Sequence, residues 1–207
     1  YGANVEAVKG VTGSGIQPVF PNKLMVTNFL KPVKNLSEFT LELAFKGRGF
    51  MFSTFPNPDF RLTFSSEGIH VLYSVIRKGK RVTERWVIPL KGTGVASYHN
   101  LENNQWHHFV FTAKKTGYFE LWIDGKTDST FKHTTDPFNS WVINSADGLR
   151  LDAAIDELTF YTTALSNDLV QQHAYELENG QHYSFRINPA IIPRQKSIAK
   201  QEIYIMD

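Results

Sequence analysis

The chain has 207 residues, no cysteine, and 22 Lys+Arg against 20 Asp+Glu, which gives a formal net charge of +2. The lack of cysteine excludes disulfides, thiolate metal sites and a cysteine nucleophile. The near-neutral charge gives no general field for nucleic acid or a membrane surface. With 42% hydrophobic residues the chain can bury a core as one domain, yet no apolar run reaches the roughly 18 residues of a membrane span.

Residues 1–36 predict an N-terminal lead-in and a first strand region. Residues 2–15 contain four glycines among small and polar neighbours, which favours a flexible segment. Regular patterns follow in residues 37–181. Residues 182–207 include two prolines and a polar run, so they predict a C-terminal extension or arm. If the chain forms oligomers, we expect this arm to make the contact.

Strict alternation is the dominant pattern of the central region. In residues 37–45 the side chains of Phe39, Leu41, Leu43 and Phe45 fall on one face, which predicts a half-buried strand. Similar patterns predict strands over residues 59–65, 68–74, 81–88, 105–112, 118–124, 141–144, 149–152 and 155–161. Turn residues between the strands at 59–65 and 68–74 predict a hairpin. The pair Asp124-Gly125 predicts another.

A single helix is predicted after the last of these strands. Ser166 is a suitable N-cap, Asp168 lies in the first turn and Gly180 supplies a stop. Apolar residues recur between them at helical spacing. Many short strands with frequent turns and one short helix predict an all-β fold, an antiparallel β-sandwich.

Three motifs in order suggest a family. They are Asn-Gln-Trp-His-His-Phe-Val-Phe-Thr at residues 104–112, Leu-Trp-Ile-Asp-Gly at 121–125, and Ala-Ile-Asp-Glu-Leu-Thr-Phe-Tyr at 154–161 followed by Ala-Leu-Ser at 164–166. They resemble the laminin-G-like domains of the concanavalin A-like lectin/glucanase superfamily. The resemblance implies a jelly roll of two curved sheets. It covers lectins, adhesion modules and glycan-cleaving enzymes, so it leaves the function open.

A catalytic site is not expected. Glycoside hydrolases of this superfamily carry a Glu-x-Asp-x-x-Glu strand, and no segment of the chain matches it. The nearest segment places Asp152 and Asp156 on one face, roughly 13 Å apart along a strand, too far for an acid–nucleophile pair. His107 and His108 are adjacent in a strand, so they point to opposite faces and do not chelate one ion. A glycan-cleaving enzyme with a non-standard site remains an alternative.

The sharpest binding feature is a cationic turn. Arg77, Lys78, Lys80 and Arg81 surround Gly79 at the expected tip of a hairpin. Guanidinium and ammonium groups suit sulfate and carboxylate. The family that the chain resembles includes acidic-glycan binders, which is consistent with such a ligand. The alternative is a solvated turn whose lysines protect an edge strand.

Aromatic residues in turn-rich stretches form a second candidate. Tyr98 and His99 precede an asparagine, and Phe138 and Trp141 flank Asn139-Ser140. Exposed rings beside polar side chains would suit a neutral glycan. The alternative is that these rings belong to the core.

Calcium is the third candidate, and here the resemblance supplies the residue. Several family members bind Ca²⁺ near a sheet rim, which nominates Asp156, with Asp152 as a weaker neighbour. Calcium takes about 6–8 oxygen ligands, so other groups would have to contribute. The alternative for Asp156 is hydrogen bonding to backbone N–H groups at the sandwich edge.

Together these features predict a non-catalytic, secreted or cell-surface module that binds a glycan. The alternative is a structural subunit that contacts an extracellular protein. Neither a nucleic-acid partner nor membrane insertion is expected.

Overall fold

The structure is a computed structural model, which describes residues 5–18, 25–27, 33–36, 38–53, 60–65, 68–78, 80–89, 104–116, 118–127, 133–134, 141–143 and 148–183. Its elements are β1 (Val5–Lys9), β2 (Ser14–Pro18), β3 (Met25–Thr27), β4 (Val33–Leu36), β5 (Phe39–Ser53), β6 (Phe60–Ser65), β7 (Gly68–Arg77), β8 (Lys80–Pro89), β9 (His107–Ala113), β10 (Tyr118–Ile123), β11 (His133–Thr134), β12 (Trp141–Ile143), β13 (Gly148–Tyr161) and α1 (Asn167–Glu178). The fold is the predicted antiparallel β-sandwich with one short helix. None of the helical structure described is long and apolar enough to cross a membrane.

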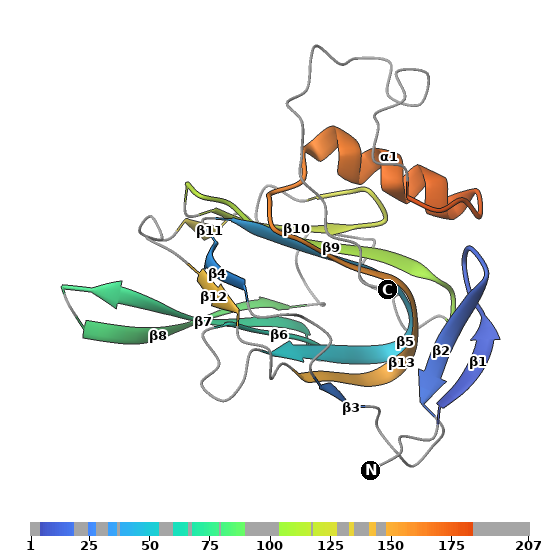
Figure 1. The fold of residues 1–207 in the computed structure, drawn as a ribbon, viewed down its shortest axis with the longest axis horizontal. Helices are drawn as coiled ribbons and strands as arrows, with labels where there is room; N and C mark the ends of the chain where they lie inside the picture. The colour runs from blue at the N-terminus through green and yellow to red at the C-terminus, as the bar shows by residue number, and fades with distance from the viewer. Residues whose placement is uncertain are drawn as a thin grey trace.

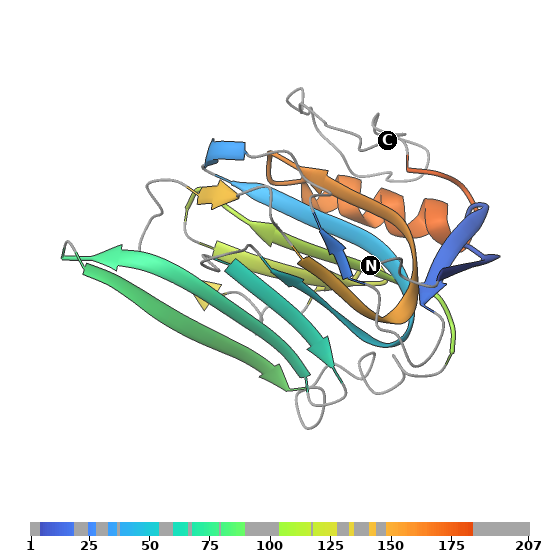
Figure 2. The ribbon, with the colours of Figure 1, turned by 60° about the horizontal axis from the view of Figure 1, so that its bottom comes forward.

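Two long, bent strands connect the two layers of the sandwich. The first half of β5 pairs with β9, and its second half pairs with β6. β13 follows β5 through the bend, where the pairing shifts register between Leu151 and Ala153. Figures 1 and 2 show the two strands curving together at one end of the molecule. One layer therefore contains β9, β10 and β11, the other contains β6, β7 and β8, and β5 and β13 belong to both.

The core lies between these layers and is rich in phenylalanine. Phe39 of β5 stacks on Phe160 of β13 with ring centroids 5.5 Å apart, and Phe60 lies 5.1 Å from Phe111. The buried residues of this cluster come from β5, β6, β7, β9, β10 and β13. Every second residue of these strands points inward, as the alternation predicts.

The other face of β5 differs from the prediction, because α1 covers it. Thr40, Glu42 and Ala44 are at most 1% exposed, although their alternation with the phenylalanines predicts a half-buried strand. The helix packs on this face through a second apolar cluster, formed by Val110, Trp122, Tyr161, Leu165, Leu169 and Val170. The strand is therefore buried on both sides.

The helix itself is as predicted. The Ser166 hydroxyl accepts a hydrogen bond from the Leu169 N–H at 3.3 Å, and the helix ends at Glu178, two residues before Gly180. The two segments predicted as separate strands near residues 149–161 form the single strand β13. Residues 184–207, which make up most of the predicted C-terminal extension or arm, lie outside the described residues.

The glycine-rich N-terminus folds, where the sequence predicts a flexible lead-in. β1 and β2 form an antiparallel hairpin that pairs with β13 through Ile16 and Ile155. Figure 1 shows this hairpin beside the bend of β5 and β13, near the C-terminal end of α1. The sequence reading missed it because short strands with several glycines carry little alternation.

Candidate functional site

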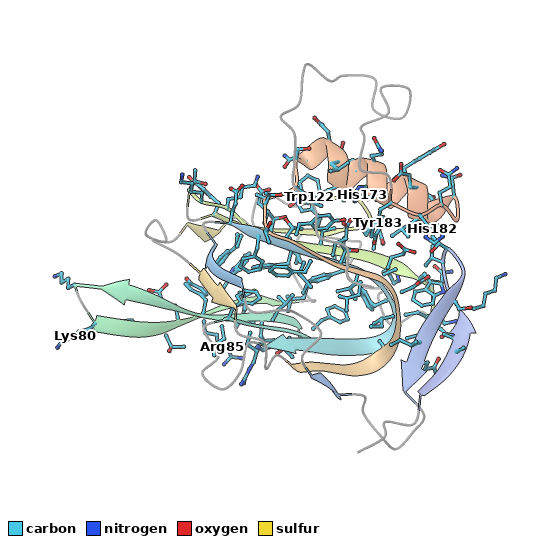
Figure 3. The ribbon with its side chains drawn as sticks, viewed as in Figure 1. Lys80, Arg85, Trp122, His173, His182 and Tyr183 are labelled. Atoms are coloured by element: carbon cyan, nitrogen blue, oxygen red, sulfur yellow. The ribbon has the colours of Figure 1, made fainter. Side chains whose placement is uncertain are left out.

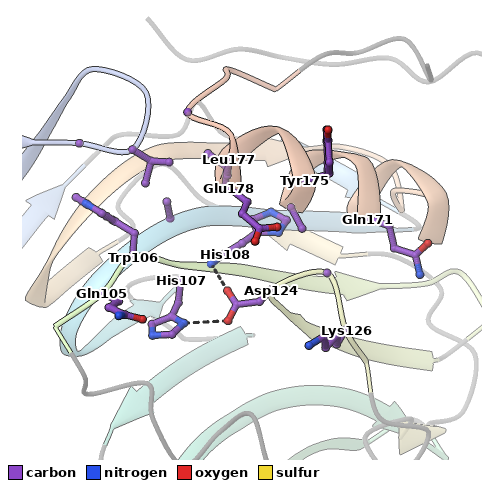
Figure 4. A pocket seen from close by; sticks show the side chains of 16 residues that line it. Gln105, Trp106, His107, His108, Asp124, Lys126, Gln171, Tyr175, Leu177 and Glu178 are labelled. Atoms are coloured by element: carbon purple, nitrogen blue, oxygen red, sulfur yellow. Dashed lines mark hydrogen bonds and ion pairs between the residues drawn. The ribbon is translucent and has the colours of Figure 1, made fainter. Parts of the chain in front are cut away.

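A pocket of about 760 Å³ opens between α1, the start of β9 and the turn after β10 (Figure 4). The turn between β1 and β2 closes one side through Gly10 and Val11. The larger polar and aromatic side chains that line the pocket are those of Gln105, Trp106, His107, His108, Asp124, Lys126, Gln171, Tyr175 and Glu178.

Two of the sequence motifs interlock to form the floor of this pocket. The Asp124 carboxylate accepts a hydrogen bond from the His108 backbone N–H at 2.9 Å and lies 2.9 Å from His107 Nδ1 (Figure 4). The Asp124 N–H donates in turn to the His108 carbonyl at 2.9 Å. These hydrogen bonds hold the Asp-Gly turn after β10 against the first residues of β9.

Gly125 is required at this turn for two reasons. Its φ is +68° and that of Asp124 is +49°, the left-handed pair that a two-residue hairpin turn needs. A Cβ atom at Gly125 would also lie 2.8 Å from the Cβ of Ala174 on α1. The turn and the helix therefore approach each other closely only because residue 125 has no side chain.

We expect Gly125→Ala to lower the free energy of unfolding by about 1–3 kcal/mol, because it adds left-handed strain and a clash. Urea denaturation measures the change. In an Ala174→Gly background the clash is relieved, so the same substitution should cost less there, although Ala174→Gly alone weakens the helix by about 1 kcal/mol. Equal costs in the two backgrounds would show that the helix does not press on the turn.

Beneath the pocket, Glu42 joins α1 to the sheet. Its carboxylate lies 2.7 Å from His108 Nε2 and 2.9 Å from His173 Nδ1, and it accepts a hydrogen bond from the Tyr161 hydroxyl at 2.6 Å. Figure 3 shows His173 and Tyr183 between the helix and the strands. The ring of Tyr183 stacks on His173 at 4.7 Å.

This cluster is ionised at Glu42 and closed to solvent. Burial alone would raise the pKa of Glu42, but attraction to His173 and the hydrogen bonds of both imidazoles hold that pKa well below its usual range. Burial, with the adjacent carboxylate, raises the pKa of Tyr161 far above its usual range, so Tyr161 stays a hydrogen-bond donor. Glu42 is completely buried, and both of its oxygens are used inside the protein. We therefore assign it to stability.

His107 and His108 lie on opposite faces of β9, as predicted. The His107 ring packs 5.8 Å from Phe45 of the core, whereas His108 faces Glu42 and the helix. Since a carboxylate only accepts, His108 donates from Nε2. Its Nδ1 is buried and has no hydrogen-bond partner among the described residues.

Asp156 anchors the N-terminal hairpin. Its Oδ2 accepts hydrogen bonds from the N–H groups of Val11 at 2.9 Å and Thr12 at 3.3 Å, and its Oδ1 accepts one from the N–H of Glu157 at 2.9 Å. This is the alternative that the sequence left open for Asp156. These donors do not fit calcium, which needs oxygen ligands, and the described residues contain no group of three His, Asp or Glu side chains that could hold a metal. The side chain of Asp152 is outside the described part, and calcium stays an untested prediction.

The predicted cationic residues lie far from this pocket. Arg77 pairs with Lys80 across the end of the β7–β8 hairpin, and Arg81 pairs with Ile76. Lys78 and Lys80 are exposed, and Lys78 has φ +49° in the turn. Figures 1 and 2 show this hairpin projecting from the end of the molecule opposite β1 and β2. Nothing described tests whether the four cations bind a ligand.

The predicted aromatic site falls largely outside the described residues. Tyr98, His99 and Phe138 are among the residues left undescribed. Trp141 begins β12 and pairs with Leu36 of β4, but its side chain is not described. The described residues do not test whether these four come together, and their role remains a prediction.

The sequence reading missed the pocket residues of the helix. Gln171, Tyr175 and Glu178 recur at helical spacing on the side of α1 opposite its buried residues, and all three are exposed. That spacing was a usable signal. What it did not reveal is that the helix lies beside Trp106 and the turn after β10.

Comparisons with known proteins agree with this architecture. A laminin G family model, described as "Concanavalin A-like lectin/glucanases superfamily", matches residues 33–171. Domain 4 of AbnA, a GH43 extracellular arabinanase from Geobacillus stearothermophilus in complex with arabinotriose, is 16% identical with a TM-score of 0.54, over 84% of this chain and 82% of that domain. Comparison with curated proteins finds no match.

A second solved structure has the same fold on a larger scale. The botulinum neurotoxin serotype G binding domain is 11% identical with a TM-score of 0.54, over 84% of this chain. The chain spans less than half of that structure, 45% of its length. At such identities the likeness concerns the fold, while the family match covers most of the sandwich and continues into the helix. The chain therefore belongs to the concanavalin A-like lectin/glucanase superfamily, as a laminin-G-like domain.

Proposed function

We propose that this domain is an extracellular or cell-surface module that binds a glycan in the pocket between α1 and the β9–β10 layer. The observation that carries the proposal is the lining of that pocket. Trp106 and Tyr175 supply aromatic surface, and the side chains of Lys126, Gln171 and Glu178 make no hydrogen bond or ion pair within the described part of the chain. Aromatic surface with a few available polar groups is a usual composition for a ligand site.

The comparisons support a binding role. The arabinanase domain with the same fold is in complex with arabinotriose, and the botulinum neurotoxin structure is a binding domain. The first is one numbered domain of an enzyme, and the second is the binding domain of a toxin. These likenesses favour a binding module within the superfamily.

A non-catalytic role is supported by where the perturbed carboxylate lies. Catalytic acids and bases usually have shifted pKa values and reach the substrate. The pKa of Glu42 is clearly shifted, but this carboxylate is buried with both oxygens occupied, so it does not reach a ligand. A glycan-cleaving activity at a non-standard site is the alternative, and release of reducing ends from bound glycans would reveal it.

The test is a glycan array on the full chain, followed by calorimetry with the best hit. Tyr175→Ala should weaken binding roughly five- to tenfold, about 1 kcal/mol, because it removes an exposed ring at the pocket. Tyr118→Ala is the matched control, since Tyr118 is also exposed but lies on β10 away from the pocket. Trp106 is a poorer probe because it also packs against Ala44, Leu177 and Tyr183.

Two results would contradict the proposal. One is an array on which no glycan binds. The other is a bound glycan whose affinity is the same in Tyr175→Ala and Tyr118→Ala, since the site would then lie elsewhere on the domain.

A second candidate function is the binding of an acidic glycan at the β7–β8 hairpin. The exposure of Lys78 and Lys80 at a projecting tip favours it. The double variant Lys78→Ala/Lys80→Ala should then weaken binding to a sulfated glycan, and added salt should weaken it further. Binding that is insensitive to salt would reject this candidate.

A further inference from the structure

We infer that the pocket beside α1 accepts an uncharged sugar unit and disfavours an anionic one. The inference rests on the proposed glycan-binding function and specifies the chemistry of its ligand. Three observations carry it: the charges that line the pocket, the end of the helix that borders it, and the kinds of donor it offers.

With its two histidines counted as neutral, the pocket lining carries more negative than positive charge. Asp124 and Glu178 line it as carboxylates, against the one ammonium group of Lys126 among its described lining residues. The Asp124 carboxylate is held in place by the His108 N–H and by His107, yet 41% of its side chain stays exposed. Like charges repel, so an anionic ligand in the pocket would meet a net repulsive field from these carboxylates.

The helix adds to this field. The pocket borders the C-terminal half of α1, from Gln171 to Glu178, and continues to Gly180. The C-terminal end of a helix carries a partial negative charge, which cations usually compensate. The last turn of α1 contains no basic residue. The carbonyls of this last turn accept hydrogen bonds from the N–H groups of residues 179–181, so what remains of the partial negative charge meets no cation from within the helix.

The available donors also suit hydroxyl groups rather than sulfate or carboxylate. Anionic groups are bound best by the paired donors of arginine or by clusters of backbone N–H groups. None of the described residues that line the pocket is arginine. Asp124 and Glu178 can accept from sugar hydroxyls, and the Gln171 amide can donate to and accept from them. A neutral polyhydroxylated ligand matches this set.

Two exposed lysines, Lys78 and Lys80, lie together at the other end of the domain. Figure 3 shows Lys80 at the tip of the β7–β8 hairpin, at the opposite end of the molecule from His182 and the C-terminal end of α1. These two lysines attract anions to the hairpin tip, whereas the described pocket lining contributes a single lysine. The net charge of +2 gives no indication of this separation.

The experiment compares neutral and anionic forms of the same sugar. Calorimetry on the full chain, in the Lys78→Ala/Lys80→Ala background, would compare galactotriose with trigalacturonate. A second comparison would use glucose oligomers and glucuronate oligomers of the same linkage. For each sugar that binds, we expect the neutral form to bind at least fivefold more tightly than its uronic-acid form at low salt. The difference should shrink toward about 0.5 M salt, where the screening length falls to a few ångströms.

Charge variants at Glu178 give the second readout. Glu178→Gln and then Glu178→Lys should each improve binding of the uronic-acid probe by about two- to fivefold, the range of exposed charge pairs. Glu38→Gln is a matched charge change at a described residue outside the pocket lining and should leave the preference unchanged.

The outcomes separate the two proposals. Absence of binding to every probe, neutral or charged, would overturn the proposed glycan-binding function. A uronic-acid probe that binds as tightly as its neutral partner, and loses affinity in Tyr175→Ala, would overturn only the neutral-ligand inference. Neutral binding that depends on Tyr175, with relief of the anionic penalty in Glu178→Lys, would support both.

Discussion

Replacing Glu42 by alanine is expected to lower the free energy of unfolding by about 3–5 kcal/mol, because one partner of a buried charged cluster is removed. The substitution leaves Tyr161, His108 and His173 without the acceptor that they share. Unfolding in urea, followed by fluorescence and circular dichroism, measures the loss. Tyr161→Phe removes one hydrogen bond from the same cluster and should cost only about 1–2 kcal/mol.

The pH dependence of stability tests whether Glu42 is ionised. Its pKa in the folded state lies below the unfolded value of about 4.3. A group whose pKa is lowered by folding adds stability above its unfolded pKa, and that stability is lost as the pH falls toward the folded pKa. The stability advantage of the native chain over Glu42→Gln should therefore be full at pH 6 and shrink below about pH 4.3. An advantage that stays constant down to pH 2 would contradict an ionised Glu42.

Phe111→Ala is expected to have a comparable effect, about 3–5 kcal/mol, because it leaves a cavity between the two layers. The Phe111 ring is completely buried, with ring centroids 5.1 Å from Phe60 and 5.4 Å from Phe119. It therefore contacts aromatic residues of both layers. The measurement is the same urea denaturation.

Phe111→Leu and Tyr118→Ala provide the controls for this substitution. Leucine keeps much of the buried volume, so it should cost clearly less than alanine. Tyr118 is 39% exposed, so its truncation should change stability by about 0.5 kcal/mol or less. If Phe111→Ala destabilised the domain as little as Tyr118→Ala, the phenylalanine-rich core would not be the main source of its stability.

The sequence was a good guide where local pattern decides the structure. Alternation in residues 39–45 assigned the inward face of β5 correctly, and Ser166 identified the start of the helix. Asp124-Gly125 identified its turn because two residues with positive φ need this chemistry. Each of these features depends on neighbours within a few positions of the chain.

What the sequence did not indicate depends on contacts between distant segments. Glu42 looks like a solvent-facing residue of an amphipathic strand, and only the packing of α1, about 130 positions later, makes it a buried anion. The pocket likewise combines the β1–β2 turn, the start of β9, the turn after β10 and one side of the helix. Its residues carry no shared local pattern that would have brought them together.

Asp156 accepts hydrogen bonds from the β1–β2 turn and so places that turn beside the pocket. This affects how the domain should be compared with others. The family match covers residues 33–171, but the pocket uses Gly10 and Val11 before that range and Tyr175 and Glu178 after it. An alignment restricted to the matched range compares the scaffold and omits part of the proposed binding surface. Two members could then align well over the shared core and still bind different sugars, so ligand preference is better inferred from the segments that flank the family boundaries.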